Sequence, residues 1–147
     1  MFYEDFEPGG VHTTAARTVT IDDVDRFIDL SGLKNPLFTS DESARGLGHS
    51  GRLVPGPLQL SMAMGLVQQA GLFNHVVAVL EFERLRFLGP VFPGDAITLT
   101  ATVVEKRETS NPARGLVVMD FNLANQDGKT VMSARARYLM ARRDDST

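Results

Sequence analysis

The sequence predicts an α+β domain in which an antiparallel sheet wraps around one long central helix. The helix is indicated by the segment from Pro57 onward, which consists of good helix formers with apolar side chains on every face. A helix of this kind is normally central and buried. The sheet is indicated by four later segments of strand character, most of which alternate apolar and polar residues with a period of two. Since the helix must be covered, we expect the strands to curl around it as one sheet.

The length and composition narrow the class of protein further. The 147 residues suit one domain that buries roughly two-thirds of the surface of its unfolded chain. The net charge of -3 arises from 18 acidic and 15 basic residues spread along the chain, which argues against nucleic acid and against a membrane as partner. Cysteine is absent and the three histidines are far apart, so we expect no metal and no cofactor. The N-terminus lacks the pattern of a secretory signal, and we therefore expect a cytoplasmic protein.

The first part of the chain predicts a short strand and then a helix. The strand is expected near residues 11–19, and the helix over residues 21–30. Thr20, with Asp23 three residues later, is close to a capping box. Gly32 supplies a stop signal for the helix.

A loop follows this helix and leads to a second, shorter one. Ser40 is a suitable N-cap for the segment "DESARG", so we expect a brief helix that ends at Gly46. The long helix then begins at Pro57, since proline is favoured at the first helical position.

The remaining chain predicts four strands. Residues 75–90 begin as a wholly apolar run, which predicts a buried strand, and become mixed after Leu80, where we expect a bulge or an emerging edge. Asp127-Gly128 suits a tight hairpin between the last two strands. The side chains expected to face the helix from the other three strands are Ile97, Leu99, Ala101, Val103, Val117, Met119, Phe121, Leu123, Met132, Ala134, Ala136 and Tyr138.

This order of elements is the hotdog arrangement, and several stretches resemble one hotdog family in particular. The chain resembles the MaoC-like (R)-specific enoyl-thioester hydratases and dehydratases in five stretches. In chain order these are "FEPGG", "RTVTIDDVDRFIDLSG", "NP", "GRLVPGPLQLS" and "RLRFLGPVFPGDAITLTATVVEKR". The resemblance covers nearly the whole chain and implies a single hotdog domain over residues 1–147. It also implies an acyl-CoA or acyl-carrier thioester as ligand, a place in fatty acid metabolism, and a homodimer or a heterodimer with a related hotdog chain.

The catalytic loop departs from the family pattern. In the family, the loop after the first helix reads S-G-D-x-N-P-x-H, and its Asp and His hold a water and move protons. The "SG" and "NP" pairs match here, but Leu33 occupies the Asp position and Phe38 the His position. Hydration needs a poised base and an acid, and neither replacement transfers protons. The resemblance therefore predicts an altered active site.

Other parts of the family site are partly kept. Gly56 matches a glycine at the start of the long helix, where the resemblance implies that a backbone N–H polarises the thioester carbonyl; Pro55 replaces the usual His. The alternative for Gly56 is a steric need for glycine at a crowded turn. Ser61 matches a serine that some members use near the catalytic water, although a serine in a buried helix more often bonds back to a carbonyl.

Two titratable residues are candidates for a relocated base. His49 lies near the expected mouth of the site, where an imidazole is a suitable base, but a histidine in a glycine-rich loop is more often exposed and idle. Asp41 follows the loop, and capping the short helix is its simpler role. Arg52, Arg84 and Arg86 are candidates for contacts with coenzyme A phosphates or are ordinary surface residues.

Leu33, Asn35 and Phe38 have both functional and structural interpretations. Leu33 and Phe38 line an apolar acyl pocket, or they fill the space left by two polar residues. Asn35 contributes to the site, or it serves only the turn that it forms with the following proline.

Three functions follow from these interpretations. The first is an acyl-thioester hydratase or dehydratase with His49 or Asp41 as the relocated base. The second is a subunit that binds an acyl thioester without catalysis, or that completes a heteromeric dehydratase whose partner carries the Asp and the His. The third, a thioesterase, is weaker because it needs a carboxylate near Gly56, where the helix offers only Gln59 and Gln68.

Overall fold

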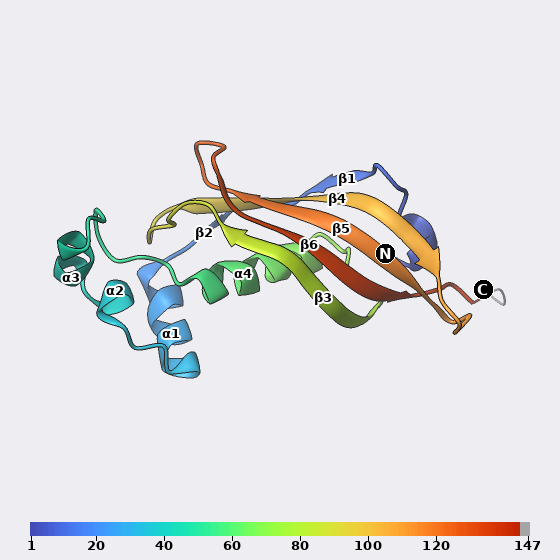
Figure 1. The fold of residues 1–147 in the computed structure, drawn as a ribbon, viewed down its shortest axis with the longest axis horizontal. Helices are drawn as coiled ribbons and strands as arrows, with labels where there is room; N and C mark the ends of the chain where they lie inside the picture. The colour runs from blue at the N-terminus through green and yellow to red at the C-terminus, as the bar shows by residue number, and fades with distance from the viewer. Residues whose placement is uncertain (145–147) are drawn as a thin grey trace.

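The computed structural model describes residues 1–144, and they form one sheet with a long helix along one face (Figure 1). The strand order in the sheet is β1-β4-β5-β6-β3, all neighbours are antiparallel, and β2 pairs separately with β4. The elements in chain order are η1 (Tyr3–Asp5), β1 (Val11–Thr13), β2 (Arg17–Thr18), α1 (Ile21–Ser31), α2 (Pro36–Thr39), α3 (Asp41–Gly46), α4 (Gly56–Gln69), β3 (Val76–Phe87), β4 (Ala96–Glu108), β5 (Arg114–Ala124) and β6 (Thr130–Ala141).

The core lies between α4 and the sheet. All the side chains that the sequence predicts to face the helix are buried, and the two largest fully buried side chains of the molecule are Phe6 and Phe121. From α4, Leu58, Met62, Ala63, Leu66 and Val67 pack into the same cluster. The predicted α+β architecture is therefore confirmed, because the period-two alternation of β4, β5 and β6 turns one face of each strand toward the helix.

The predicted start of β3 as a buried strand is wrong. Val77, Val79 and Leu80 are 43%, 52% and 55% exposed. The reason is topological, since β3 forms the edge of the sheet and pairs only with β6. The predicted bulge is confirmed, because the register between β3 and β6 shifts at three places, one of them between Val79 and Glu81.

The predicted helix signals near the N-terminus are confirmed. Thr20 Oγ1 accepts the Asp23 N–H at 3.1 Å and Asp23 Oδ2 accepts the Thr20 N–H at 2.9 Å, which completes the capping box of α1. Gly32 ends the helix in the left-handed conformation, with φ of 77°. Ser40 caps α3 as predicted. The sequence did not predict α2, a single turn whose Leu37 N–H donates to the Asn35 side chain at 2.9 Å.

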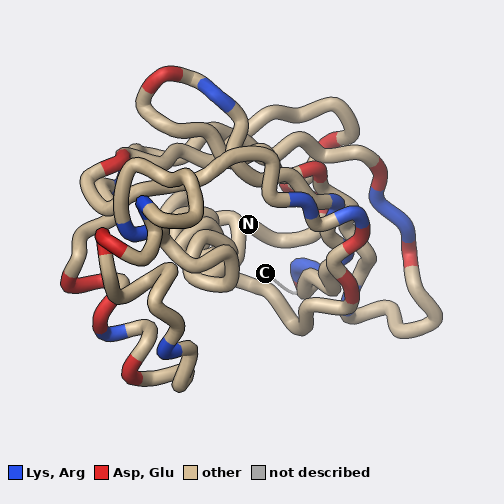
Figure 2. Tube along the Cα trace, turned by 60° about the vertical axis from the view of Figure 1, so that its left-hand side comes forward, with Lys and Arg blue, Asp and Glu red and all other residues tan. Residues whose placement is uncertain are grey.

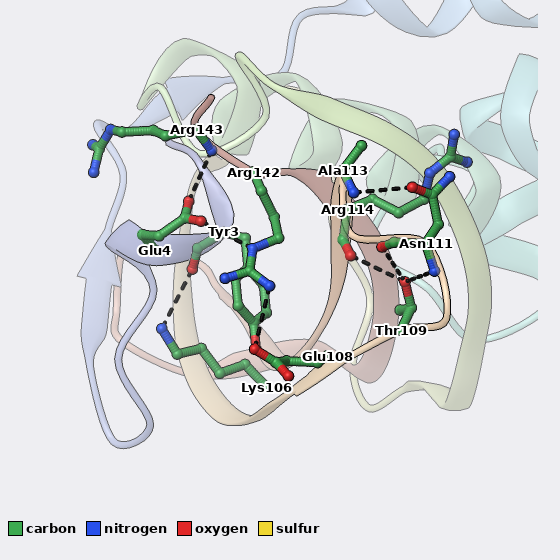
Figure 3. A network of polar contacts seen from close by, with 10 residues as sticks. All are labelled: Tyr3, Glu4, Lys106, Glu108, Thr109, Asn111, Ala113, Arg114, Arg142 and Arg143. Carbon is green, nitrogen blue, oxygen red and sulfur yellow. Dashed lines mark hydrogen bonds and ion pairs between the residues drawn. The ribbon is translucent and has the colours of Figure 1, made fainter. Parts of the chain in front are cut away.

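The N-terminal segment closes the end of the sheet that lies far from α1, α2 and α3 (Figures 1 and 3). The Tyr3 ring packs against Gly115 so closely that a Cβ there would lie 2.3 Å from the ring. The ring also makes two cation–π contacts, with Lys106 Nζ 4.8 Å and the Arg142 guanidinium 5.1 Å from its centroid. Arg142 bonds Glu4 at 3.1 Å as well, so this end is held by both packing and charge.

Charges of both signs are distributed along the chain, as Figure 2 shows, and the charged residues of the small helices α1 and α3 are mainly acidic. Within residues 1–144, no helix is long and apolar enough to cross a membrane. In the same part of the chain, no three side chains of the metal-binding types come together.

Candidate functional site

An apolar groove lies where the start of α4 meets the end of β3 and the loop around His49. Its volume is about 540 Å³. Most of its lining is aliphatic or aromatic, which suits an acyl chain. The lining residues are Phe38, His49, Leu53, Val54, Gly56, Pro57, Gln59, Phe87, Leu88, Gly89 and Pro90.

Gly56 lines this groove and lies close to the ring of Phe87. A Cβ at Gly56 would lie 2.9 Å from Cζ of that ring, so the position needs glycine for reasons of space. Within residues 1–144 the Gly56 N–H donates no hydrogen bond, whereas the N–H groups of Leu58 and Gln59 both donate to the Pro55 carbonyl. A free donor at the first residue of a 14-residue helix is well placed to bind a carbonyl oxygen. The two interpretations of Gly56 are therefore compatible.

Gln59 follows Gly56 by one helical turn and also lines the groove. Its side chain is only 3% exposed, and its Oε1 atom is buried with no hydrogen-bond partner in the described chain. A buried amide oxygen normally has a partner, because leaving it without one costs free energy. The residue that lines the groove at this turn therefore carries one buried polar atom that the protein itself does not satisfy.

His49 and Phe38 both reach the groove. His49 is half-buried, and its backbone N–H donates to the Ala44 carbonyl at 3.1 Å, which holds the loop. Among the groove-lining residues of the described chain, His49 is the one with a titratable side chain. Phe38 is partly buried and packs against the core as well as lining the groove. At this position the structure therefore supports both the pocket and the filling role predicted for Phe38.

Arg52 holds the small helices against this groove. Its side chain is 13% exposed, and its guanidinium donates to Asp25 Oδ1 of α1 at 2.6 Å and to the Phe38 carbonyl of α2 at 2.8 Å. Its backbone N–H donates to Asp41 Oδ1 at 2.8 Å. These contacts engage the guanidinium inside the protein and give Arg52 a structural role, in contrast to the predicted contact with coenzyme A phosphates.

The other predicted site residues lie outside the groove lining. Leu33 is 36% exposed on the loop after α1, and Asn35 caps α2. Asp41 holds the Arg52 backbone, as described above. Ser61 is exposed and its hydroxyl bonds back to the Pro57 carbonyl at 2.9 Å, which is the structural interpretation of this serine. Pro55 is buried and is the N-cap residue of α4, where its carbonyl accepts the N–H groups of Leu58 and Gln59.

Arg84 and Arg86 lie apart from the groove, in a shallow cleft of about 280 Å³ on the sheet. The cleft also contains Arg135, which forms a bidentate pair with Asp120 at 2.8 and 3.1 Å. Arg84 has a φ of 54° at the register shift of β3, an uncommon conformation for a residue with a side chain. The structure thus separates these arginines from the other predicted site residues.

Sequence reasoning missed two contributors to the groove. Gln59 was considered only as a substitute for a carboxylate, although a polar residue in the first turns of an otherwise apolar helix is itself a signal. Phe87 was missed because nothing in the sequence indicates that the end of β3 meets the start of α4.

Comparison with known proteins places the chain in a family. Residues 6–120 match the MaoC like domain. The chain belongs to the MaoC-like family. It is 34% identical over 149 residues to the mesaconyl-CoA hydratase of Cereibacter sphaeroides, an alignment that covers 99% of this chain and 42% of the relative. The chain thus spans less than half the length of that curated relative.

Solved structures agree with the MaoC-like assignment. A monoamine oxidase regulatory protein of Archaeoglobus fulgidus superposes with a TM-score of 0.89 at 32% identity, covering 98% of this chain and 96% of that one. A Mycobacterium tuberculosis protein with a double hotdog fold superposes with a TM-score of 0.81 at 21% identity, covering 99% of this chain and 45% of that one. The second likeness concerns the fold alone and confirms the predicted hotdog fold. The predicted MaoC-like resemblance is confirmed by the family match over residues 6–120.

Proposed function

We propose that this MaoC-like domain binds an acyl thioester, of coenzyme A or of an acyl carrier, in the groove at Gly56 without hydrating it by the mechanism of the family. The observation that carries the proposal is the composition of the groove. It keeps a free backbone donor at Gly56 and an apolar channel, while the position of the family's His is occupied by Phe38. The carbonyl is polarised by the helix N-terminus, and the acyl chain lies against the apolar lining.

A second candidate is hydration or dehydration with His49 as a relocated base. It is favoured by the position of His49 in the groove, where a neutral imidazole accepts a proton from water. Asp41 supports this candidate less well, because its carboxylate accepts the Arg52 N–H and lies outside the groove lining.

Binding and turnover of the same ligands distinguish the two candidates. Calorimetric titration with trans-2-enoyl-CoA of short and medium chain length measures binding, and the loss of conjugated absorbance measures hydration. We expect binding without hydration. Hydration that disappears in His49→Gln would establish the relocated base instead, and the absence of binding to coenzyme A and to carrier thioesters would overturn the proposal.

Two glycines on the same helix provide a matched pair of variants for the binding site. Gly56→Ala forces the Phe87 ring to move, whereas a Cβ at Gly65 meets nothing within 4 Å. We expect Gly56→Ala to weaken binding of the thioester by at least about tenfold, corresponding to about 1.4 kcal/mol. Gly65→Ala should leave the affinity unchanged. Equal affinities of the two variants would contradict a site at Gly56.

We also propose that β3 pairs with a second copy of the chain. The strand is 12 residues long, its outer edge is unpaired in the described chain, and its exposed side chains include Val79 and Leu80. A long unpaired edge with exposed apolar side chains in its first half is a template for pairing. The double hotdog relative supports the idea, since this chain matches 45% of it and two copies would supply two such units. Phe87 and Leu88 continue from this edge into the groove, so a partner there would border the site.

Sedimentation equilibrium tests the pairing. The wild type should be a dimer, and Val79→Lys/Leu80→Lys should shift it toward monomer. Val11→Lys is the control, because Val11 is 62% exposed on the short strand β1 at the opposite edge. A monomeric wild type that becomes a dimer only with a related MaoC-like chain would favour the heteromeric dehydratase over the homodimer.

A further inference from the structure

The shallow cleft on the sheet carries an excess of positive charge, although the chain as a whole has a net charge of -3. Among the side chains that line it, Arg84, Arg86 and Arg135 are basic and Asp120 alone is acidic. Arg135 already forms a bidentate pair with Asp120, so the two arginines of β3 supply the excess. Cations gathered in one cleft attract an anion.

The two arginines of β3 have little engagement with the rest of the protein. Within residues 1–144, the Arg86 guanidinium makes no hydrogen bond and no ion pair. Arg84 has one ion pair, with the carboxylate of the adjacent Glu83 at 3.9 Å, and that carboxylate is bound more closely by Arg137, at 2.7 Å. A long ion pair between exposed side chains contributes little. The donors of both guanidinium groups are therefore available to a ligand.

A bulge in β3 directs Arg86 into the cleft. Glu83 lies opposite Arg135 and Arg86 lies opposite Ser133, so the same step takes three residues on β3 and two on β6. Residues three apart on a regular strand face opposite sides of the sheet, and the extra residue therefore brings Arg86 to the same side as Ser133. Arg84 lies within the bulge with a φ of 54°, a strained conformation that is concentrated at functional sites.

Neutral donors complete the cleft. Ser133 lies opposite Asn122 of β5, and its hydroxyl makes no hydrogen bond within residues 1–144. These side chains lie on the face of the sheet that is turned away from α4 (Figure 1), because the alternate residues of β5 and β6 pack against the helix. Guanidinium groups bind two oxygens of a phosphate at once, and a hydroxyl donates to a third. The donors of the cleft thus match a phosphate group.

We propose that this cleft on the outer face of the sheet binds a phosphate monoester, in a site separate from the thioester groove. Arg84 and Arg86 bind the phosphate oxygens, and Ser133 donates to the same group. Pairing of β3 with a second copy uses the backbone at the edge of the sheet and leaves the outer face open. The phosphate belongs to a free phosphorylated metabolite or to the ribose phosphate of coenzyme A, and the test distinguishes these sources.

The test follows the side-chain N–H groups of the arginines by NMR. Isotope-labelled wild type, Arg86→Gln and Arg107→Gln are titrated with inorganic phosphate and with glycerol phosphate at low salt. Arg107 is the matched control, because it is 61% exposed on β4 of the same sheet and is not among the residues that line the cleft. We expect glycerol phosphate to bind the wild type and Arg107→Gln with a Kd of about 1 mM, and Arg86→Gln at least about fivefold more weakly.

Arg84→Gly separates a binding role from a structural one. Glycine adopts a positive φ without strain, so we expect the melting temperature to rise by about 2 °C while phosphate binding weakens about threefold or more. A residue with only a structural role would not give these opposite changes. A melting temperature that falls, or phosphate binding that stays at the wild-type level, would show that Arg84 serves only the bulge.

Coenzyme A and dephospho-coenzyme A distinguish the two sources of the phosphate. Shifts of the Arg84 and Arg86 resonances with coenzyme A alone would assign the site to its ribose phosphate. Binding of glycerol phosphate that is unchanged in the presence of saturating coenzyme A would assign it to a free metabolite. The inference is overturned if phosphate shifts neither resonance, if chloride displaces phosphate at equal concentration, or if Arg107→Gln weakens binding as much as Arg86→Gln. Thioester binding at Gly56, measured by calorimetry, is independent of all these outcomes.

Discussion

The two ends of the molecule each place an aromatic ring over a glycine, with opposite results. At one end Tyr3 covers Gly115, is 6% exposed, and is surrounded by cations and ion pairs. At the other end Phe87 covers Gly56, is 47% exposed, and borders a groove that contains a buried amide oxygen without a partner. The Tyr3 ring therefore covers part of the core, whereas the Phe87 ring borders an open groove.

The comparison indicates which end is optimised for stability. At the Tyr3 end, Figure 3 shows a network of polar contacts in which Glu4 bonds both Arg142 and the Arg143 N–H. At the groove end, the Gly56 N–H and Gln59 Oε1 have no partner in the described chain. Groups left unsatisfied cost stability, and a ligand that satisfies them recovers it.

The largest expected difference between the two ends concerns the rings themselves. Tyr3→Ala should destabilise the protein by about 3 kcal/mol, because it removes a buried aromatic side chain from the core. Phe87→Ala should cost less than about 1 kcal/mol, since the ring is half-exposed, but it should change thioester affinity. Urea unfolding of both variants measures the first effect and calorimetry the second. Equal costs would mean that Phe87 is a core residue and that the ends do not differ.

Arg52 provides a smaller test at the groove end. Arg52→Met removes the bonds to Asp25 and to the Phe38 carbonyl, and we expect a loss of about 1–2 kcal/mol in unfolding free energy together with weaker thioester binding. The control is Arg26→Met, whose ion pair with Asp22 is exposed, at 79% and 69%, and is worth about 0.5 kcal/mol or less. If Arg52→Met behaves like Arg26→Met, the small helices do not depend on this residue for their position.

Local signals in the sequence were sufficient for most of the fold. The alternation of β4, β5 and β6 fixed their buried faces, and the Thr20 and Ser40 caps fixed the starts of α1 and α3. Each of these depends on residues close together in the chain. The edge position of β3 depends instead on the order of the strands in the sheet. The sequence of an apolar run such as Val76–Leu80 is the same whether the core of its own chain or a partner chain covers it, so the sequence does not distinguish the two cases.

The candidate site could be predicted only in part for the same reason. The family pattern located Gly56 and Phe38, both of which line the groove. It also pointed to Ser61, and the position just past the loop suggested Asp41 as a relocated base. The hydrogen bonds that these side chains make, to the Pro57 carbonyl and to the Arg52 N–H, are not visible in a motif. The unsatisfied state of Gln59 is likewise a property of the packed protein, because it depends on every neighbour that fails to offer a donor.

The smallest expected effect concerns pH and should be the same at both ends. Hydrogen bonds from backbone N–H groups, of Phe2 to Asp5 and of Thr20 to Asp23, hold the pKa of each carboxyl below its usual value. Each therefore stabilises the folded state above the ordinary pKa of 3.8, and this contribution is lost as the pH falls through the lowered value.

Asp5→Ala and Asp23→Ala should each cost about 1 kcal/mol at pH 7, as for the loss of a helix cap, and progressively less below pH 4. Urea unfolding at several pH values measures both. Similar profiles would mean that the groove end is as firmly folded as the Tyr3 end, so that the difference between the ends is confined to the groove itself. A much smaller effect for Asp23 would instead mean that the helices beside the groove are only weakly held in place. The free Gly56 N–H would then result from local disorder of the fold and not from a preformed binding site.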